Sequence, residues 1–462
     1  MSENVYQIDF NKPESVHFIG IGISMSGLAE ILMDEGFTVS GSDAHRSELT
    51  DNLEARGAKV YIGQRAENIQ DGIDVVVYTA AIHPDNPEFR EVKRRGIPML
   101  TRAELLGEMM RNYKNAIAIA GTHGKTTTTS MVTEIFLQAK NDPTISVGGI
   151  LPAIGGNIRV GGPEFFVTEA CEYTNSFLSF YPTMAVILNI EEDHLDFFKD
   201  LADIRRSFKL FAERVPAQGA VVINGDIENY QEIIEAAKGK VITFGHSRGN
   251  DYSAGDIQYD DYAHPSFDLY IDGEKKERLT LGVAGEHNVY NALAAIAVSL
   301  ENGISMDAIR VGLAHFTGTN RRFEKKGEVN GFTIIDDYAH HPHEIEATLK
   351  TAQNYPHKTL WCIFQPHTYT RTKALFNDFV KELRVPDVVV LAEIYAAREQ
   401  NDIGISSMDL SREIPGSVYC PTLDKVTAAL ARIACPGDLI LTVGAGDIFK
   451  AGEKLLKEKE ES

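Results

Sequence analysis

Short apolar runs alternate with amphipathic stretches along most of the chain. The amphipathic stretches place apolar residues three or four positions apart, and most of the runs end at Gly, Asp, Glu or His. This alternation is typical of β-α-β units, which build parallel sheets. The runs that we expect to be strands are Ser15–Ile19, Asp74–Tyr78, Asn115–Ala120, Phe165–Thr168, Ala185–Ile190, Gly331–Ile335, Thr359–Phe364, Asp387–Leu391 and Asp438–Val443. Because ligands of such sheets bind beyond the carboxyl ends of the strands, the residues that follow each run are the first candidates for function.

The order of these segments predicts an α/β protein with three domains. A chain of 462 residues allows about three domains at ~150 residues each. We expect a Rossmann-like N-terminal domain over residues 1–113 and a P-loop-type central domain with a mainly parallel sheet over 114–318. A Rossmann-like C-terminal domain would follow over 319–462. Within the central domain, the stretch Val241–Leu281 is more polar, and we expect antiparallel strands there.

Composition narrows the classes of protein that fit. The net charge of −21 repels phosphate backbones, so we expect no nucleic-acid partner. The four cysteines are scattered and predict neither a zinc ribbon nor a disulfide framework. The N-terminus does not resemble a signal peptide and the apolar runs are too short to span a bilayer, so we expect a cytoplasmic enzyme without a membrane partner.

A phosphate-type loop follows the predicted strand Asn115–Ala120. Its sequence is Gly121-Thr122-His123-Gly124-Lys125-Thr126-Thr127, and an amphipathic helix comes after it. Backbone N–H groups and the helix dipole at such a junction favour a phosphate, and glycines let the backbone approach it closely. Lys125 suits β- and γ-phosphate oxygens, and the Thr126 hydroxyl suits Mg²⁺. The alternative is a Gly-rich capping turn with a surface lysine, which the flanking strand and helix make the weaker interpretation.

Acidic residues and histidines follow the next two predicted strands. Glu169 and Glu172 come at the end of the first, and His194 comes after the second. Mg²⁺ prefers carboxylate and water oxygens, so these strand ends are the expected source of its ligands. His194 is a softer ligand that could bind a second metal or orient a carboxylate. A helix-capping role for the acidic residues remains open from the residues alone.

The last block carries a second polar cluster. His340 and His341 follow the strand Gly331–Ile335, and Pro342 suits the first position of a helix. Arg371, after the strand Thr359–Phe364, could clamp a carboxylate. Near the start of this block, Arg321 or Arg322 could swing onto a phosphate if the segment acts as a hinge; a solvated surface role is the alternative for each arginine.

A Gly-rich turn also follows the first predicted strand. The turn contains Gly20, Gly22 and Ser24, and the second strand is expected to end at Ser40. Asp43 then stands where an acidic residue holds ribose hydroxyls in nucleotide-binding folds. The turn departs from the strict Gly-x-Gly-x-x-Gly pattern, so it predicts a nucleotide site without specifying which nucleotide.

Taken together, these segments resemble the Mur ligases of peptidoglycan precursor synthesis over essentially the whole chain. The segments that carry the resemblance are 121–127, 169–173, 189–196, 285–291, 318–323, 337–342 and 367–371. The resemblance implies ATP-dependent amide formation through an acyl phosphate, with ATP and Mg²⁺ as cofactors. It implies UDP-N-acetylmuramate and L-alanine as substrates, with a murein tripeptide as the alternative amine.

The resemblance also implies roles for individual residues. Catalysis would involve Lys125, His194, Arg322, His340 and Arg371. The ATP-binding residues would be Gly121, Thr122, His123, Gly124, Lys125, Thr126, Thr127, His287, Asn291 and Arg322. The sugar nucleotide and amino acid would contact Gly20, Gly22, Ser24, Asp43 and His341. The metal would be held by Thr126, Glu172 and His194, with Glu169 as the alternative to Glu172.

Two other classes of protein are less consistent with these residues. An oxidoreductase would bind nicotinamide at the first Gly-rich turn, but the turn lacks a glycine and a separate phosphate loop is present. A non-catalytic nucleotide-binding regulator would not need the intact Lys125-Thr126 pair. Related ligases carry a modified lysine at the spacing of Lys209, which we expect here to be an ordinary surface lysine.

Overall fold

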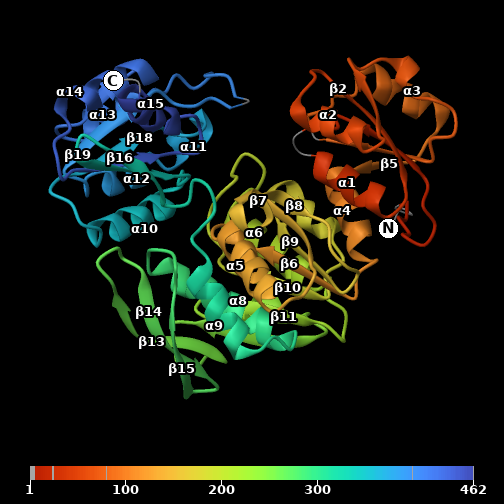
Figure 1. Cartoon of the computed structure of the whole chain (residues 1–462), viewed down its shortest axis with the longest axis horizontal. Helices are drawn as coiled ribbons and strands as arrows, with labels where there is room; N and C mark the ends of the chain where they lie inside the picture. Colours follow the sequence, from red (N-terminus) through yellow and green to blue (C-terminus); the bar gives the residue numbers. More distant parts are fainter. Residues whose placement is uncertain (1–5, 23–24, 80, 398, 461–462) are drawn as a thin grey trace. The chain divides into compact units, whose positions relative to one another are not determined.

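The computed structural model describes residues 6–22, 25–79, 81–397 and 399–460 (Figure 1). By compactness, the chain divides into two units. The first contains residues 1–191 and 201–243, and the second contains residues 192–200 and 244–462. The described residues form three sheets, which confirms the predicted α/β class; the three domain boundaries given above stay a prediction.

The first sheet is entirely parallel, in the order β3-β2-β1-β4-β5. Its strands are β1 (Ser15–Ile19), β2 (Thr38–Asp43), β3 (Lys59–Ile62), β4 (Val75–Tyr78) and β5 (Met99–Thr101). Its helices are α1 (Ser26–Asp34), α2 (Glu48–Ala55), η1 (Ala66–Asn68), α3 (Pro87–Arg95) and α4 (Arg102–Met110). The prediction that the second strand ends at Ser40 is wrong. Pairing continues because Gly41 and Ser42 lie opposite Phe18 and Ile19 of the buried central strand.

The second sheet follows the order β15-β14-β13-β12-β11-β10-β6-β9-β7-β8. Its strands are β6 (Asn115–Ala120), β7 (Thr144–Leu151), β8 (Gly156–Arg159), β9 (Phe165–Ala170), β10 (Met184–Ile187), β11 (Ala220–Asn224), β12 (Lys240–Gly245), β13 (Tyr252–Tyr259), β14 (Pro265–Ile271) and β15 (Glu274–Thr280). Its helices are α5 (Lys125–Gln138), η2 (Pro152–Ile154), η3 (Tyr173–Ser179), α6 (Leu201–Ala212), α7 (Gln231–Ile234), α8 (His287–Glu301) and α9 (Met306–His315). The β13–β14 and β14–β15 pairs are antiparallel, which confirms the expectation for most of the polar stretch, whereas β12 at its start pairs with β13 in parallel.

The third sheet follows the order β16-β17-β21-β18-β19-β20 and is parallel except for β16. Its strands are β16 (Glu324–Val329), β17 (Phe332–Asp337), β18 (Leu360–Phe364), β19 (Val388–Ala392), β20 (Val418–Cys420) and β21 (Leu439–Val443). Its helices are α10 (Pro342–Gln353), α11 (Tyr369–Ala374), α12 (Phe376–Glu382), α13 (Ser407–Glu413), α14 (Leu423–Ile433) and α15 (Phe449–Glu460). Pro342 opens α10, as its fixed backbone angle predicts.

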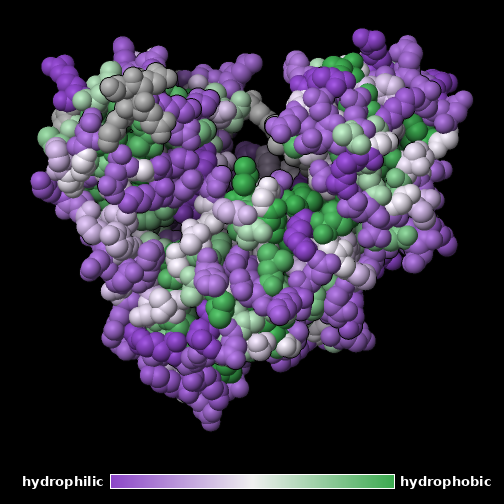
Figure 2. All heavy atoms as spheres, viewed as in Figure 1, coloured by the Kyte–Doolittle hydropathy of each residue, from purple (hydrophilic) through white to green (hydrophobic). Residues whose placement is uncertain are grey.

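The buried strands explain why the pattern of apolar runs was informative. β6, β18 and β21 are buried over nearly all of their length, as expected for parallel strands covered on both faces. Figure 2 shows a surface on which hydrophilic residues predominate, in keeping with the net charge of −21. Among the described residues, no helix has the length and apolar character needed to cross a membrane. All four cysteines lie in the described part of the chain, and none of them forms a disulfide there.

Candidate active site

The phosphate-type loop lies where three neighbouring parallel strands end. β6 runs between β10 and β9, with Ala120 opposite both Ile187 and Ala170. The loop after β6 is therefore flanked by the residues that follow these two strands. Gly124 is the N-cap of α5 at φ +83°, and Gly121 has φ +151°. A Cβ on Gly121 would lie 2.9 Å from Cβ of Leu188, so both positions favour glycine.

Asn189 fastens this loop to the end of β10. Its side-chain oxygen accepts from the backbone N–H of His123 at 2.7 Å, and its amide donates to the His123 carbonyl at 3.0 Å. The Thr122 hydroxyl accepts from the Glu191 backbone N–H at 2.9 Å, and the His123 ring lies 3.2 Å from the Glu191 carboxylate. Sequence reasoning gave Asn189 no role, although an asparagine directly after a strand beside the loop was an available signal.

Lys125 is the cation of the loop, and it is held on the protein's own oxygens. Its Nζ donates to the carbonyls of Gly121 and Thr122 at 2.5 and 3.2 Å. It also lies 3.0 and 3.2 Å from the two carboxylate oxygens of Glu172, which is 2% exposed. Burial alone lowers the pKa of Lys125, but the Glu172 charge, with Cys171 and Glu169, raises it overall. The lysine is therefore charged at neutral pH and anchored beside the helix start.

The donor set suits a hard cation. Glu172 places a buried carboxylate beside the loop, and Thr126 is the second residue of α5. Glu169, the alternative ligand, instead accepts a hydrogen bond from the Gly148 backbone N–H at 2.5 Å. His194 belongs to the second unit and has φ +54°, a conformation uncommon for residues other than glycine. The oxygen donors in the first unit fit Mg²⁺; a complete ligand set stays a prediction.

Helix α8 carries the residues expected near adenine. His287 is its first residue, and Gly285, two residues earlier, has φ +98°. Asn291 is buried and donates from its amide to the Asn288 side-chain oxygen at 3.0 Å. Asn288 in turn donates to the Ala284 carbonyl at 2.7 Å, so the helix start is fixed by its own amides.

The two neighbouring arginines before β16 have different surroundings. Arg321 donates from Nε to buried Asp336 at 2.8 Å and from Nη1 and Nη2 to the carbonyls of Gly446 and Gly444. The Arg322 guanidinium makes no hydrogen bond to the described residues and its Cζ lies 5.2 Å from the Tyr338 ring centre, while its backbone N–H donates to the Thr319 carbonyl at 3.2 Å. Arg321 therefore holds this segment to the third sheet, whereas a ligand role for Arg322 stays a prediction.

Asp193 organises the histidine and arginine cluster at the carboxyl ends of β17 and β18. Arg371 donates to Asp193 Oδ1 from Nη2 at 3.0 Å and from Nε at 3.2 Å, and from Nη1 to His367 Nδ1 at 3.2 Å. Burial alone raises the pKa of Asp193, but the charges of Arg371, His194 and His340 and the His194 backbone N–H hold it below its usual range. Arg371 thus clamps a carboxylate as expected, but it is one that the chain supplies.

The two adjacent histidines of this cluster have different environments. Burial lowers the pKa of His340 to about 4, so the ring is neutral at pH 7. His341 is the N-cap of α10: its Nδ1 accepts from the His343 backbone N–H, and its Nε2 donates to the Glu192 carbonyl at 3.1 Å. Both ring nitrogens of His341 are engaged, so a substrate contact through it would require one of these hydrogen bonds to break.

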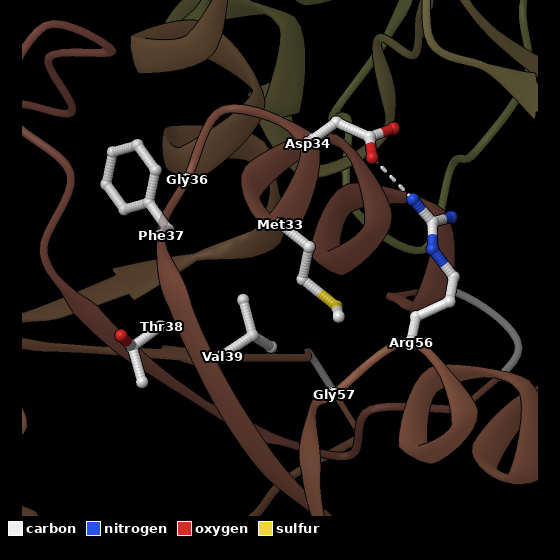
Figure 3. A pocket seen from close by; sticks show the side chains of 8 residues that line it. All are labelled: Met33, Asp34, Gly36, Phe37, Thr38, Val39, Arg56 and Gly57. Carbon is white, nitrogen blue, oxygen red and sulfur yellow. Dashed lines mark hydrogen bonds and ion pairs between the residues drawn. The ribbon is translucent and has the colours of Figure 1, made fainter.

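The first Gly-rich turn is held by the end of β2. Gly22 donates its backbone N–H to Asp43 Oδ2 at 2.9 Å, and Gly20 has φ +87°. Ser24 lies outside the described residues. A separate hollow is lined by Met33, Asp34, Gly36, Phe37, Thr38, Val39, Arg56 and Gly57 (Figure 3). Because Thr38 begins β2 and Asp43 ends it, this hollow is at the opposite end of the strand from the turn.

A Gly-rich loop with an anchored lysine, between a parallel strand and a helix start, is typical of α/β proteins that bind nucleotide phosphates. The chain belongs to the Mur ligase family. Residues 15–114 match the Mur ligase family catalytic domain, 119–299 the Mur ligase middle domain, and 321–446 the Mur ligase glutamate ligase domain.

Individual relatives are similar over their full length. The chain is 60% identical to the UDP-N-acetylmuramate–L-alanine ligase of Lachnospira eligens, over 98% of this chain and 100% of that protein. It is 57% identical to the corresponding ligase of Agathobacter rectalis, with the same coverage. Among solved structures, the UDP-N-acetylmuramate–alanine ligase of Thermotoga maritima matches with a TM-score of 0.79 at 29% identity, covering 97% of this chain and 99% of that one. A murein peptide ligase from Psychrobacter arcticus matches with a TM-score of 0.70 at 25% identity, covering 96% and 98%.

Proposed function

We propose that this chain joins L-alanine to the lactyl carboxylate of UDP-N-acetylmuramate, with ATP as the energy source, in the synthesis of peptidoglycan precursors. The observation that carries this proposal is the anchored Lys125 in a phosphate loop, within a chain 60% identical to an alanine-adding ligase. The tripeptide alternative is not adopted, because the relatives with 60% and 57% identity over 98% of this chain are both named as alanine-adding ligases. We place the reaction in the cytoplasm, where ATP is available, and propose no nucleic-acid partner.

In the first step, a lactyl carboxylate oxygen attacks the γ-phosphorus of ATP, the bond to the β-γ bridging oxygen breaks, and ADP leaves. Lys125 would leave Glu172 and the loop carbonyls to bind phosphate oxygens, and Gly121 to Thr127 would cradle them through backbone N–H groups. Mg²⁺, held by Thr126, Glu172 and His194, would neutralise phosphate charge. The guanidinium of Arg322, which makes no hydrogen bond to the described residues, would place positive charge beside the negative charge on the transferred phosphoryl group. His287 and Asn291 would bind the adenine.

In the second step, the amine of L-alanine attacks the acyl carbon, phosphate leaves with the former carboxylate oxygen, and the amine proton is released. Arg371 and neutral His340 would orient the amino acid, His340 accepting a hydrogen bond from the amine. Gly20, Gly22, Ser24 and Asp43 would bind the sugar nucleotide, and His341 would hold the start of α10 beside this site. No covalent nucleophile is needed, because the phosphate is the leaving group.

Phosphate release from ATP and Mg²⁺ tests this function directly. The arms are UDP-N-acetylmuramate alone, L-alanine alone, both together, and the sugar nucleotide with a murein tripeptide. We expect release only when the sugar nucleotide and L-alanine are both present. Phosphate release with the tripeptide but not with alanine would assign the chain to the recycling reaction. If folded protein released no phosphate in any arm, the catalytic proposal would be overturned.

A further inference from the structure

Two consecutive residues at the end of β2 hold three consecutive backbone N–H groups of the first Gly-rich turn. The carbonyl of Ser42 accepts from Gly20 at 2.9 Å and from Ile21 at 2.8 Å. The carboxylate of Asp43 accepts from Gly22 at 2.9 Å. The position of the turn therefore depends directly on the position of this strand end.

A buried carboxylate fixes that strand end from behind. Glu88, the second residue of α3, is 0% exposed and accepts from the Ser42 hydroxyl at 2.5 Å through Oε2. Its other oxygen accepts from the Asn68 amide at 2.5 Å, and that amide also donates to the Gly63 carbonyl at 2.9 Å. Gly63 donates its own N–H to the Asp43 carbonyl at 2.8 Å. These bonds close a ring that runs from Ser42 through Glu88, Asn68 and Gly63 back to Asp43.

A histidine of the central strand β1 lies beside this ring of hydrogen bonds. His17 of β1 is 0% exposed, and its Nδ1 lies 2.9 Å from the Ser40 hydroxyl. Its Nε2 is buried without a hydrogen bond to the described residues and lies 3.9 Å from Glu88 Oε2. A buried carboxylate beside a buried imidazole is costly compared with an apolar pair of the same size. Both hydrogen bonds that the Glu88 side chain accepts lead to the end of β2, which points to a role there.

We infer that Glu88 is a positioning residue for the sugar-nucleotide site, acting through Ser42 and Asp43 on the turn Gly20 to Gly22. This inference rests on the proposed function, which places the sugar nucleotide at that turn. A turn that is already held in one conformation binds its ligand with little further ordering, so loosening the strand end weakens binding of the UDP moiety before it affects the chemistry. The expected signature is a loss confined to the sugar nucleotide, with ATP and L-alanine unaffected.

The test uses Ser42→Ala and Glu88→Gln in the full chain. Ser42→Ala removes the hydroxyl that joins Glu88 to β2 but keeps the carbonyl that holds the turn. Glu88→Gln keeps the shape and leaves one oxygen for Asn68, while the Ser42 hydroxyl must turn to accept. Binding of UDP-N-acetylmuramate is measured by titration calorimetry, alongside KM for all three substrates, kcat and thermal unfolding.

We expect either substitution to raise Kd and KM for the sugar nucleotide about tenfold, the effect of losing one hydrogen bond to a charged group. KM for ATP and for L-alanine should stay within about twofold, and the double variant should be no weaker than the weaker single one, since both break the same link. Ser299→Ala in α8 is the matched control, because Ser299 is equally buried and its hydroxyl donates to the Ala295 carbonyl of the same helix. It should leave all three KM values unchanged.

Variants with lower thermal stability but unchanged Kd for the sugar nucleotide would overturn the positioning role and leave Glu88 a purely structural residue. An equal rise in all three KM values would overturn it as well. Failure of the proposed function has a different signature: the wild-type chain itself would then release no phosphate in response to the sugar nucleotide and alanine. A wild-type chain that does not bind UDP-N-acetylmuramate would overturn both.

Discussion

The ammonium of Lys125 lies 3.0 Å from a carboxylate oxygen of Glu172, so the residue expected to bind phosphate is paired with the residue expected to bind the metal. The pair is buried, with side chains 17% and 3% exposed. Lys125 also donates to two loop carbonyls, so binding a phosphate oxygen through Nζ would require at least one of these contacts to break. In the proposed reaction, binding of ATP would therefore weaken contacts that hold Lys125 in the free protein.

Glu172→Gln tests the metal assignment. Loss of the carboxylate should raise the Mg²⁺ concentration needed for half-maximal activity and lower kcat by about a hundredfold, since a charge-stabilising group is removed. The readout is phosphate release as a function of Mg²⁺ concentration. Glu169→Gln is the matched control, because Glu169 bonds the Gly148 backbone instead of Lys125. The reverse pattern, with the larger Mg²⁺ dependence in the Glu169 variant, would assign the ligand to Glu169.

Asn189→Ala tests whether the loop is fastened from β10. The variant loses two hydrogen bonds to the His123 backbone, so we expect KM for ATP to rise about tenfold, with little change in KM for alanine. Asn115→Ala, at the other end of β6, provides the comparison, since its amide contacts only the exposed Glu164 carboxylate among the described residues. Equal effects of the two substitutions would contradict a specific role for Asn189.

Arg321 and Arg322 should separate stability from activity. Arg321→Met leaves Asp336 buried without its cation, and we expect it to lower the free energy of unfolding by about 3–5 kcal/mol. Arg322→Met should leave that stability nearly unchanged but reduce kcat by about a hundredfold or more, because it removes a charge meant for the phosphoryl group. The free energy of unfolding is measured by urea denaturation and kcat by steady-state kinetics for both variants. If Arg322→Met lowered the stability and Arg321→Met lowered only kcat, the two roles would have to be exchanged.

His340 predicts how stability depends on pH. In the folded chain its pKa is lowered to about 4 by burial, against the ordinary value of 6.5 that applies in the unfolded chain. Between these values the unfolded chain binds more protons, so the stability that neutral His340 supports is complete above pH 6.5 and lost as the pH falls. His340→Gln, which cannot titrate, should lose about 1–2 kcal/mol less than wild type between pH 7 and pH 5 in urea denaturation. Identical losses would contradict a partly buried imidazole that is neutral at pH 7.

The sequence predicted the strands better than the contacts between them. β1 and β6 have the expected bounds, because central parallel strands are continuous apolar runs. β10 ends at Ile187, three residues earlier than expected, because Asn189 turns to bind the phosphate loop. An apolar run alone does not show where pairing stops.

The side-chain partners in the candidate site could not be read from the pattern. Arg371 was expected to clamp a carboxylate, but its partner Asp193 is 178 residues away in the chain. Similarly, the adjacent Arg321 and Arg322 look equivalent in the sequence, and they are distinguished by the partners of Arg321, which are Asp336 and the carbonyls of Gly444 and Gly446. Such pairings depend on which strand ends meet in the sheet, and no local periodicity encodes that order.

The most direct test of the central claim follows a single oxygen atom. UDP-N-acetylmuramate labelled with ¹⁸O in its lactyl carboxylate is incubated with ATP, Mg²⁺, L-alanine and the full chain, and the released phosphate is analysed by mass spectrometry. If the carboxylate attacks phosphorus and the amine then displaces phosphate, each phosphate carries one oxygen from the carboxylate. Phosphate without the label, formed alongside the amide product, would contradict the acyl-phosphate route.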